Sequence, residues 1–214
     1  MVKASSNLTR SLLTAGVLAG PIYLAVGIVE GLTRSGFDFT RHDLSLLSNG
    51  DLGWIHIGLF WLTGALVIAA AVGMRRAMAT GRGRTWAPLM LGLYGLGLIG
   101  AGIFSADPGF GFPPGTPEKV TTVSFHGLMH FVTAGTGFIG LIVACFIMAR
   151  RFAEQGQRGL RQFSLATGII FLAGFFGIAS GSGNGWTILG FWIALIVAWA
   201  WISTVSAQLK HAAK

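Results

Sequence analysis

Charged residues are scarce in this chain. Only 10% of its 214 residues are charged, 53% are hydrophobic, and the mean hydropathy is +0.69. A soluble domain carries about 25% charged residues, so this chain cannot cover a soluble globule of its size with charge. The composition therefore excludes an ordinary soluble protein and predicts one that uses lipid as part of its solvent.

Cysteine is nearly absent as well. The single cysteine, Cys145, lies inside an apolar run. Neither an intrachain disulfide framework nor a cysteine-based metal motif can therefore form. We expect Cys145 to be a small apolar residue of a helix.

Long apolar runs dominate what is present. About 20 residues span the hydrocarbon core of a membrane, and six runs of about that length occur in succession with short joins. The chain therefore predicts an all-α, single-domain, polytopic membrane protein, a six-transmembrane-helix bundle. A cleavable signal peptide is the alternative for the first run, but its apolar part would be shorter. The predicted spans are about 11–29, 54–74, 86–104, 125–148, 163–180 and 186–205.

The basic residues alternate between the two sides of the predicted membrane. The N-terminus, the 75–85 and 150–162 connections and the C-terminus together hold twelve of the 15 Lys and Arg. The positive-inside rule then predicts that both termini are cytoplasmic, in the plasma (inner) membrane. We therefore expect the basic residues behind the net charge of +8 to contact anionic lipid and not nucleic acid.

Histidines and carboxylates gather on the opposite, outer side. His126 and His130 are spaced i, i+4, which on a helix places both imidazoles on one face. We predict that the 31–53 and 105–124 connections fold together over the outer helix ends. The pocket expected there is lined by His42, Asp43, His56, Asp107, His126 and His130.

Two further patterns concern packing. The segment 43–47 has the composition of a short amphipathic helix lying on the membrane surface. The glycine-rich run within 86–104, GLYGLGLIGAG, predicts a helix that its neighbours approach closely.

Three segments carry a family resemblance: RHDLSLLSNGDLGW, FSADPGFGFPPGTP and SFHGLMHF. With these the chain resembles the bacterial domain-of-unknown-function 998 family of integral membrane proteins, over essentially all six spans. The resemblance implies six helices in a bacterial membrane and supplies no catalytic residue. By residue types alone there is a more distant similarity to the membrane hydrolases that place Ser, Asp and three His around zinc, the alkaline ceramidases and their relatives, which usually have seven spans.

The sharpest hypothesis for the pocket is a zinc-dependent hydrolase that acts on a lipid. Buried imidazoles are costly unless they have partners, and His126 with His130 could ligate one ion. A third ligand would come from His42, His56 or Asp107. Asp43 would activate water, and Ser45 would polarise a substrate carbonyl.

Three alternatives remain open from the sequence. The polar cluster could be structural, in a non-enzymatic binding or sensor protein that takes a lipid or small polar ligand at the outer leaflet. A haem could be held between His56 and either His126 or His130. Small-molecule transport is the third, although the centres of the six spans carry no charged residue.

Overall fold

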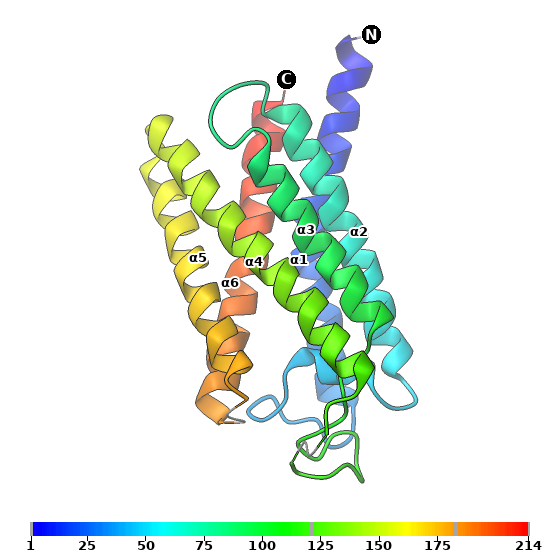
Figure 1. Ribbon diagram of the computed structural model, residues 1–214. Helices are drawn as coiled ribbons and strands as arrows, with labels where there is room; N and C mark the ends of the chain where they lie inside the picture. The colour runs from blue at the N-terminus through cyan, green and yellow to red at the C-terminus, as the bar shows by residue number, and fades with distance from the viewer. Residues whose placement is uncertain (1, 120–121, 182–183, 214) are drawn as a thin grey trace.

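The computed structural model describes residues 2–119, 122–181 and 184–213, and helices dominate it (Figure 1). Six helices are long and apolar enough to cross a membrane, which confirms the all-α, six-helix prediction. Their bounds are α1 Val2–Thr33, α2 Gly53–Ala77, α3 Trp86–Ile103, α4 Phe125–Glu154, α5 Arg158–Ala179 and α6 Gly185–Ala212, and a short 3-10 helix, η1, covers Leu44–Ser48.

The six helices form a closed ring in chain order. Each packs against the next in the sequence, and α6 closes the ring against α1. Consecutive helices run antiparallel, as expected for a bundle with short connections. Trp199 and Trp201 of α6, Tyr94 of α3 and Phe171 of α5 are among the largest fully buried side chains. Large aromatic rings therefore fill much of the interior that the ring encloses.

The two ends of the bundle differ in character. Both chain termini and the connection between α2 and α3 lie at one end, here called the terminal end (Figure 1). The connections 34–52 and 104–119 lie at the other, the loop end. The basic residues cluster at the terminal end, in and around 75–84 and 150–161. The predicted separation of basic residues from the two long connections therefore matches the two ends of the bundle. The cytoplasmic location of the termini stays a prediction.

The helices extend beyond the predicted spans chiefly at the terminal end. α4 continues to Glu154 and α5 begins at Arg158, so most of the predicted 150–162 connection is helical. The turn between them is only 155–157. Hydropathy marks the apolar part of a helix, but a helix does not have to end where lipid ends. Arginine is a good helix former, which explains why the helices run on through their basic ends.

The prediction of a surface helix at 43–47 is wrong. Its leucines Leu44, Leu46 and Leu47 are almost fully buried, and so is Ser48. The segment forms η1, which packs against α1 and α2 inside the loop end of the ring. Five residues make too short a helix to be stable on a surface, whereas inside the ring its leucines join the hydrophobic core.

Candidate functional site

His42 joins the two long connections of the loop end. Its Nδ1 accepts a hydrogen bond from the Asp38 backbone N–H at 2.9 Å, and its Nε2 lies 2.9 Å from the Phe110 carbonyl oxygen. Because a carbonyl only accepts, Nε2 carries the proton and Nδ1 does not. The buried ring also packs against both Phe37 and Phe112, which contact each other. Both nitrogens are used in holding the loops together.

Two arginines reinforce the same loop packing. Arg34 donates to the Leu47 and Asn49 carbonyl oxygens, which ties the end of η1 to the end of α1. Its guanidinium also lies 5.5 Å from the centre of the Phe112 ring. Arg41 pairs with Glu118 on the surface. The expectation that the two connections fold together over the helix ends is therefore met.

A buried hydrogen bond between a carboxylate and an imidazole lies beneath these loops. Glu30 of α1 accepts from His56 Nδ1 of α2 at 2.8 Å, and both side chains are almost fully buried. Arg34 approaches the other carboxylate oxygen of Glu30 at 3.9 Å. Tyr23 and Phe60 pack against the imidazole. His56 is therefore occupied in linking α1 to α2, by a carboxylate that the sequence pattern did not single out.

Asp107 holds the start of α4 in place. Its carboxylate accepts from the Ser124 backbone N–H at 2.8 Å and from the Ser124 hydroxyl. Ser124 is the N-cap residue of α4, and its hydroxyl accepts from the Gly127 N–H at 3.0 Å. A carboxylate at a helix N-terminus is also favoured by the helix dipole. Asp107 thus stabilises the N-terminus of α4.

Gly127 makes this arrangement possible, because a Cβ at that position would overlap the Asp107 carboxylate. We expect Gly127→Ala to turn Asp107 away from Ser124 and to lower the free energy of unfolding by about 1–2 kcal/mol. Chemical unfolding in mixed micelles would measure the loss. Gly190→Ala is the matched control, since its new Cβ would meet no atom within 4 Å, and it should be neutral or stabilising. Equal stability of the two variants would contradict this account of Asp107.

His126 and His130 have different surroundings. His126 is exposed in the first turn of α4, with its ring near Phe104 and Phe125. His130 is nine-tenths buried, at 9% exposure. Its Nδ1 lies 2.8 Å from the Phe104 carbonyl oxygen and 3.1 Å from that of Ala101. These are C-terminal carbonyls of α3 that lack a helical partner, so His130 caps the neighbouring helix.

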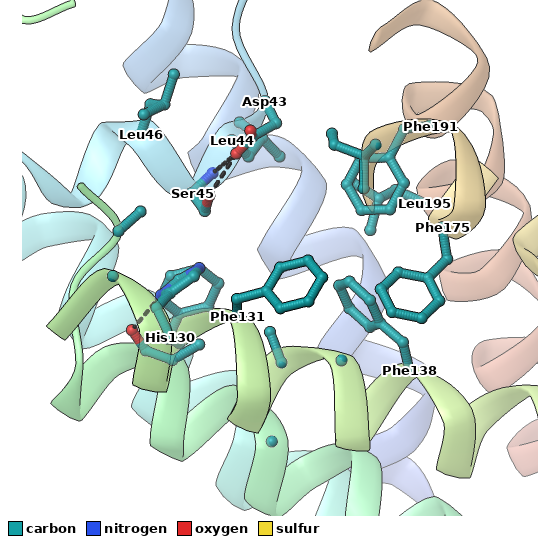
Figure 2. Close-up of a pocket in the computed structure, with 18 of the residues that line it drawn as sticks. Asp43, Leu44, Ser45, Leu46, His130, Phe131, Phe138, Phe175, Phe191 and Leu195 are labelled. Carbon is teal, nitrogen blue, oxygen red and sulfur yellow. Dashed lines mark hydrogen bonds between the residues drawn. The ribbon is translucent and has the colours of Figure 1, made fainter. Parts of the chain in front are cut away.

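This cap decides the chemistry of His130. Since carbonyl oxygens only accept, Nδ1 carries the proton of the neutral ring, and Nε2 presents a lone pair. Figure 2 shows the second ring nitrogen pointing away from the capped carbonyls, toward the cavity. His130 therefore offers a hydrogen-bond acceptor, or a metal-ligating atom, in a largely apolar setting.

Asp43 and Ser45 form a local turn on the opposite side. Asp43 is the N-cap residue of η1, and its Oδ1 accepts from the Ser45 backbone N–H at 2.9 Å and from the Ser45 hydroxyl. Such hydrogen bonds are typical of an aspartate at the N-cap position of a helix. A hydrolase hydroxyl would instead be hydrogen-bonded to a base such as His130. Asp43 and Ser45 are thus placed to present oxygen atoms, with the hydroxyl proton directed at Asp43.

A cavity of about 470 Å³ lies between these groups (Figure 2). Every one of the six long helices contributes to its wall, and so does η1. Its polar side chains near the loop end are those of Asp43, Ser45, His130 and Thr187, with Asp107 at its edge. The remaining wall is mainly aromatic and aliphatic, including Phe60, Phe131, Phe138, Phe175, Phe191 and Leu195.

The cavity reaches the surface beside the first turns of α4. Val123 and Phe131 line it and are 70% and 49% exposed. The Phe131 and Phe175 rings lie 6.3 Å apart across the α4–α5 side of the wall. The opening is therefore framed by apolar side chains, of the kind that lie against lipid in a membrane protein.

The predicted pocket is thus correct only in part. Asp43, Asp107 and His130 line the cavity, together with Ser45, whereas His42, His56 and His126 do not. The prediction that all six side chains share one pocket is wrong, because His42 and His56 lie within the loop and helix packing and His126 faces outward. Within the described ranges no group of three His, Cys, Asp or Glu side chains could hold a metal ion. The zinc site stays a prediction, and the described residues do not supply three ligands for it.

A haem between His56 and His130 would displace an aromatic ring. Phe60 packs against both imidazoles, with ring centroids 4.7 Å from His56 and 6.1 Å from His130. A haem needs both axial ligands on opposite sides of one open plane. Phe60 would therefore have to move before such a pair could form.

Sequence reasoning also missed the aromatic wall. Phe131 and Phe138 are two turns apart on α4, a spacing that puts both on one face of a helix. Phe175 and Phe191 come from separate helices and become neighbours of that stripe only in the folded ring. In a chain with 16 phenylalanines, no single spacing marks these four as a lining.

Comparison with known proteins identifies one family. A family model described as "protein of unknown function (DUF998)" matches residues 17–208, which include nearly all of the six-helix ring. Neither the curated proteins nor the solved structures contain a match to the chain.

Proposed function

The chain belongs to the DUF998 family, and we propose that it is a membrane protein that binds an amphiphilic, lipid-like molecule in the cavity of its helical ring. One observation carries the proposal: a cavity with an aromatic and aliphatic wall and a few polar groups near one end. Its volume of about 470 Å³ lies in the range of about 300–1,000 Å³ of small-molecule sites. The apolar part of a ligand would lie among the phenylalanines.

The position of the opening supports entry from the membrane. The cavity meets the surface at two exposed apolar residues, Val123 just before α4 and Phe131 within it. A ligand with an alkyl chain could pass from lipid into the cavity without entering water, so little apolar surface would be exposed on the way. In this proposal the protein lies in a bacterial plasma membrane with its loop end outward, as the basic residues of the terminal end favour.

Binding without catalysis is the better supported role. Asp43 and Asp107, which a hydrolase would use as base or ligand, each hold a helix end by hydrogen bonds. The Ser45 hydroxyl is directed at Asp43. The hydrogen bonds of these polar groups stabilise helix ends rather than prepare a nucleophile. The oxygen atoms that still face the cavity suit recognition of a head group.

Photoaffinity labelling tests the proposal directly. A diazirine analogue of 1-decanol, added to protein in neutral-lipid nanodiscs, should label peptides that contain Phe131, Phe138, Phe175 or Phe191, and excess 1-decanol should prevent it. Ala134→Phe adds a ring to the cavity wall and should reduce this labelling about tenfold, because the added volume leaves less room for the chain.

Ile139→Phe is the matched control for that variant. It places the same ring on the same helix, at a side chain that is 54% exposed and outside the cavity wall. Labelling should match the unmodified protein. Labelling that excess 1-decanol cannot prevent, or that spreads evenly over outward-facing residues such as Ile139, would overturn the proposal.

A further inference from the structure

The polar groups of the cavity share one chemical property: they favour a ligand that donates hydrogen bonds. Asp43 is a carboxylate, His130 presents the lone pair of Nε2, and the Ser45 hydroxyl proton is already given to Asp43. Each of these three groups therefore offers an acceptor at the loop end of the cavity. A head group that only accepts hydrogen bonds would leave them unpaired, which is costly away from water.

The charges around the cavity point the same way. Among the described residues that line it there are two carboxylates, Asp43 and Asp107, and neither lysine nor arginine. The two arginines of the first connection are engaged elsewhere, Arg34 with backbone carbonyls of 47 and 49 and Arg41 with Glu118. An anionic head group would thus meet like charge with no counter-charge, in surroundings of low dielectric where repulsion is strong.

The inner part of the cavity does not reverse this preference. Tyr23 and Tyr94 line it there and pack against Trp199. Their hydroxyls are neutral and can donate as well as accept, so they place no charge opposite an anion. An ammonium group would gain the carboxylates as counter-charges, and a hydroxyl group would gain only hydrogen bonds.

We infer that the cavity selects amphiphiles whose head group donates hydrogen bonds, cationic amines before neutral alcohols, and rejects anionic head groups such as carboxylate and phosphate. This selectivity rests on the proposed binding function and names the ligand class of the same site. Recognition of a carboxylate or phosphate head group would instead be favoured by a basic residue that forms charge-assisted hydrogen bonds.

Competition by a matched series tests the selectivity. Decylamine, 1-decanol and decanoate have the same chain and differ in head group, and each would compete against the photoreactive decanol in neutral-lipid nanodiscs at pH 7. We expect decylamine to compete about tenfold better than decanol, and decanol about tenfold better than decanoate. Asp43→Asn should remove most of the advantage of the amine over decanol, because the amide oxygen still accepts a hydrogen bond but carries no counter-charge for an ammonium group.

Asp51→Asn is the control for long-range charge, since Asp51 is exposed at the same end and does not line the cavity. Comparing each competitor between variants cancels its different partition into lipid. Equal competition by all three compounds would overturn the selectivity and leave the binding function intact. Absence of competition by decanol would instead overturn the binding function. Best competition by decanoate would likewise overturn the selectivity.

Discussion

Replacing Glu30 with alanine should lower the free energy of unfolding by about 3 kcal/mol, because a buried hydrogen-bond donor that loses its partner costs up to about that much. His56 is fully enclosed, and its Nδ1–H has the Glu30 carboxylate as its partner at 2.8 Å. Alanine would leave that donor buried and unpaired, and would also remove the carboxylate that faces Arg34. Unfolding in mixed micelles, followed by tryptophan fluorescence, would measure the loss.

Glu30→Gln separates charge from hydrogen bonding. The amide oxygen can still accept from His56 Nδ1, so this variant should lose about 1 kcal/mol, the size of an ordinary hydrogen-bond contribution. Combining Glu30→Ala with His56→Ala should cost less than the two single changes together, because neither partner is then stranded. If Glu30→Ala proved as stable as Glu30→Gln, the pair would not hold α1 to α2 in the way described.

The number and order of the helices could be predicted because they depend on composition alone. A run such as 54–74 must be helical in lipid, where every backbone group needs an internal partner. Helix ends are less certain from hydropathy, as Glu154 at the end of α4 shows. There the chain has left the apolar stretch, and helix propensity and packing decide where the helix stops.

The candidate site was harder to predict because polar residue types do not reveal their partners. His42, His126 and His130 looked alike in sequence, yet one joins two loops, one is exposed, and one caps α3. The i, i+4 rule placed His126 and His130 on one face correctly, but they lie a turn apart along the axis. Because of this offset, His126 lies on the exposed start of α4, whereas His130 lies where α4 contacts the end of α3.

Glu30 shows the opposite failure. Its position at the end of an apolar run is typical of an interfacial carboxylate, since charged groups commonly flank membrane helices. Its partner His56 is 26 residues away, and only the packing of α1 against α2 brings them together. Long-range pairing of this kind has no local pattern, and a single sequence cannot reveal it.

Gly95→Ala should lower the free energy of unfolding by about 2 kcal/mol through overpacking. α2 and α3 meet here backbone to backbone. A Cβ on Gly95 would lie 2.8 Å from the Gly64 carbonyl oxygen, and one on Gly64 would lie 2.7 Å from the Gly95 oxygen. Real Cβ contacts essentially never come that close, so the helices would have to separate.

The matched control is Gly92→Ala, about one turn earlier on the same helix. Its Cβ would meet Ala71 at an ordinary 3.8 Å, and alanine is a better helix former than glycine by about 1 kcal/mol. Gly92→Ala should therefore be neutral or stabilising where Gly95→Ala is destabilising. Equal unfolding free energies for the two would mean that α2 and α3 do not cross at Gly64 and Gly95. Truncating Ile68, whose Cγ1 would lie at the same 2.8 Å, should not fully rescue Gly95→Ala, because the Gly64 carbonyl oxygen belongs to the backbone and would still obstruct the new Cβ.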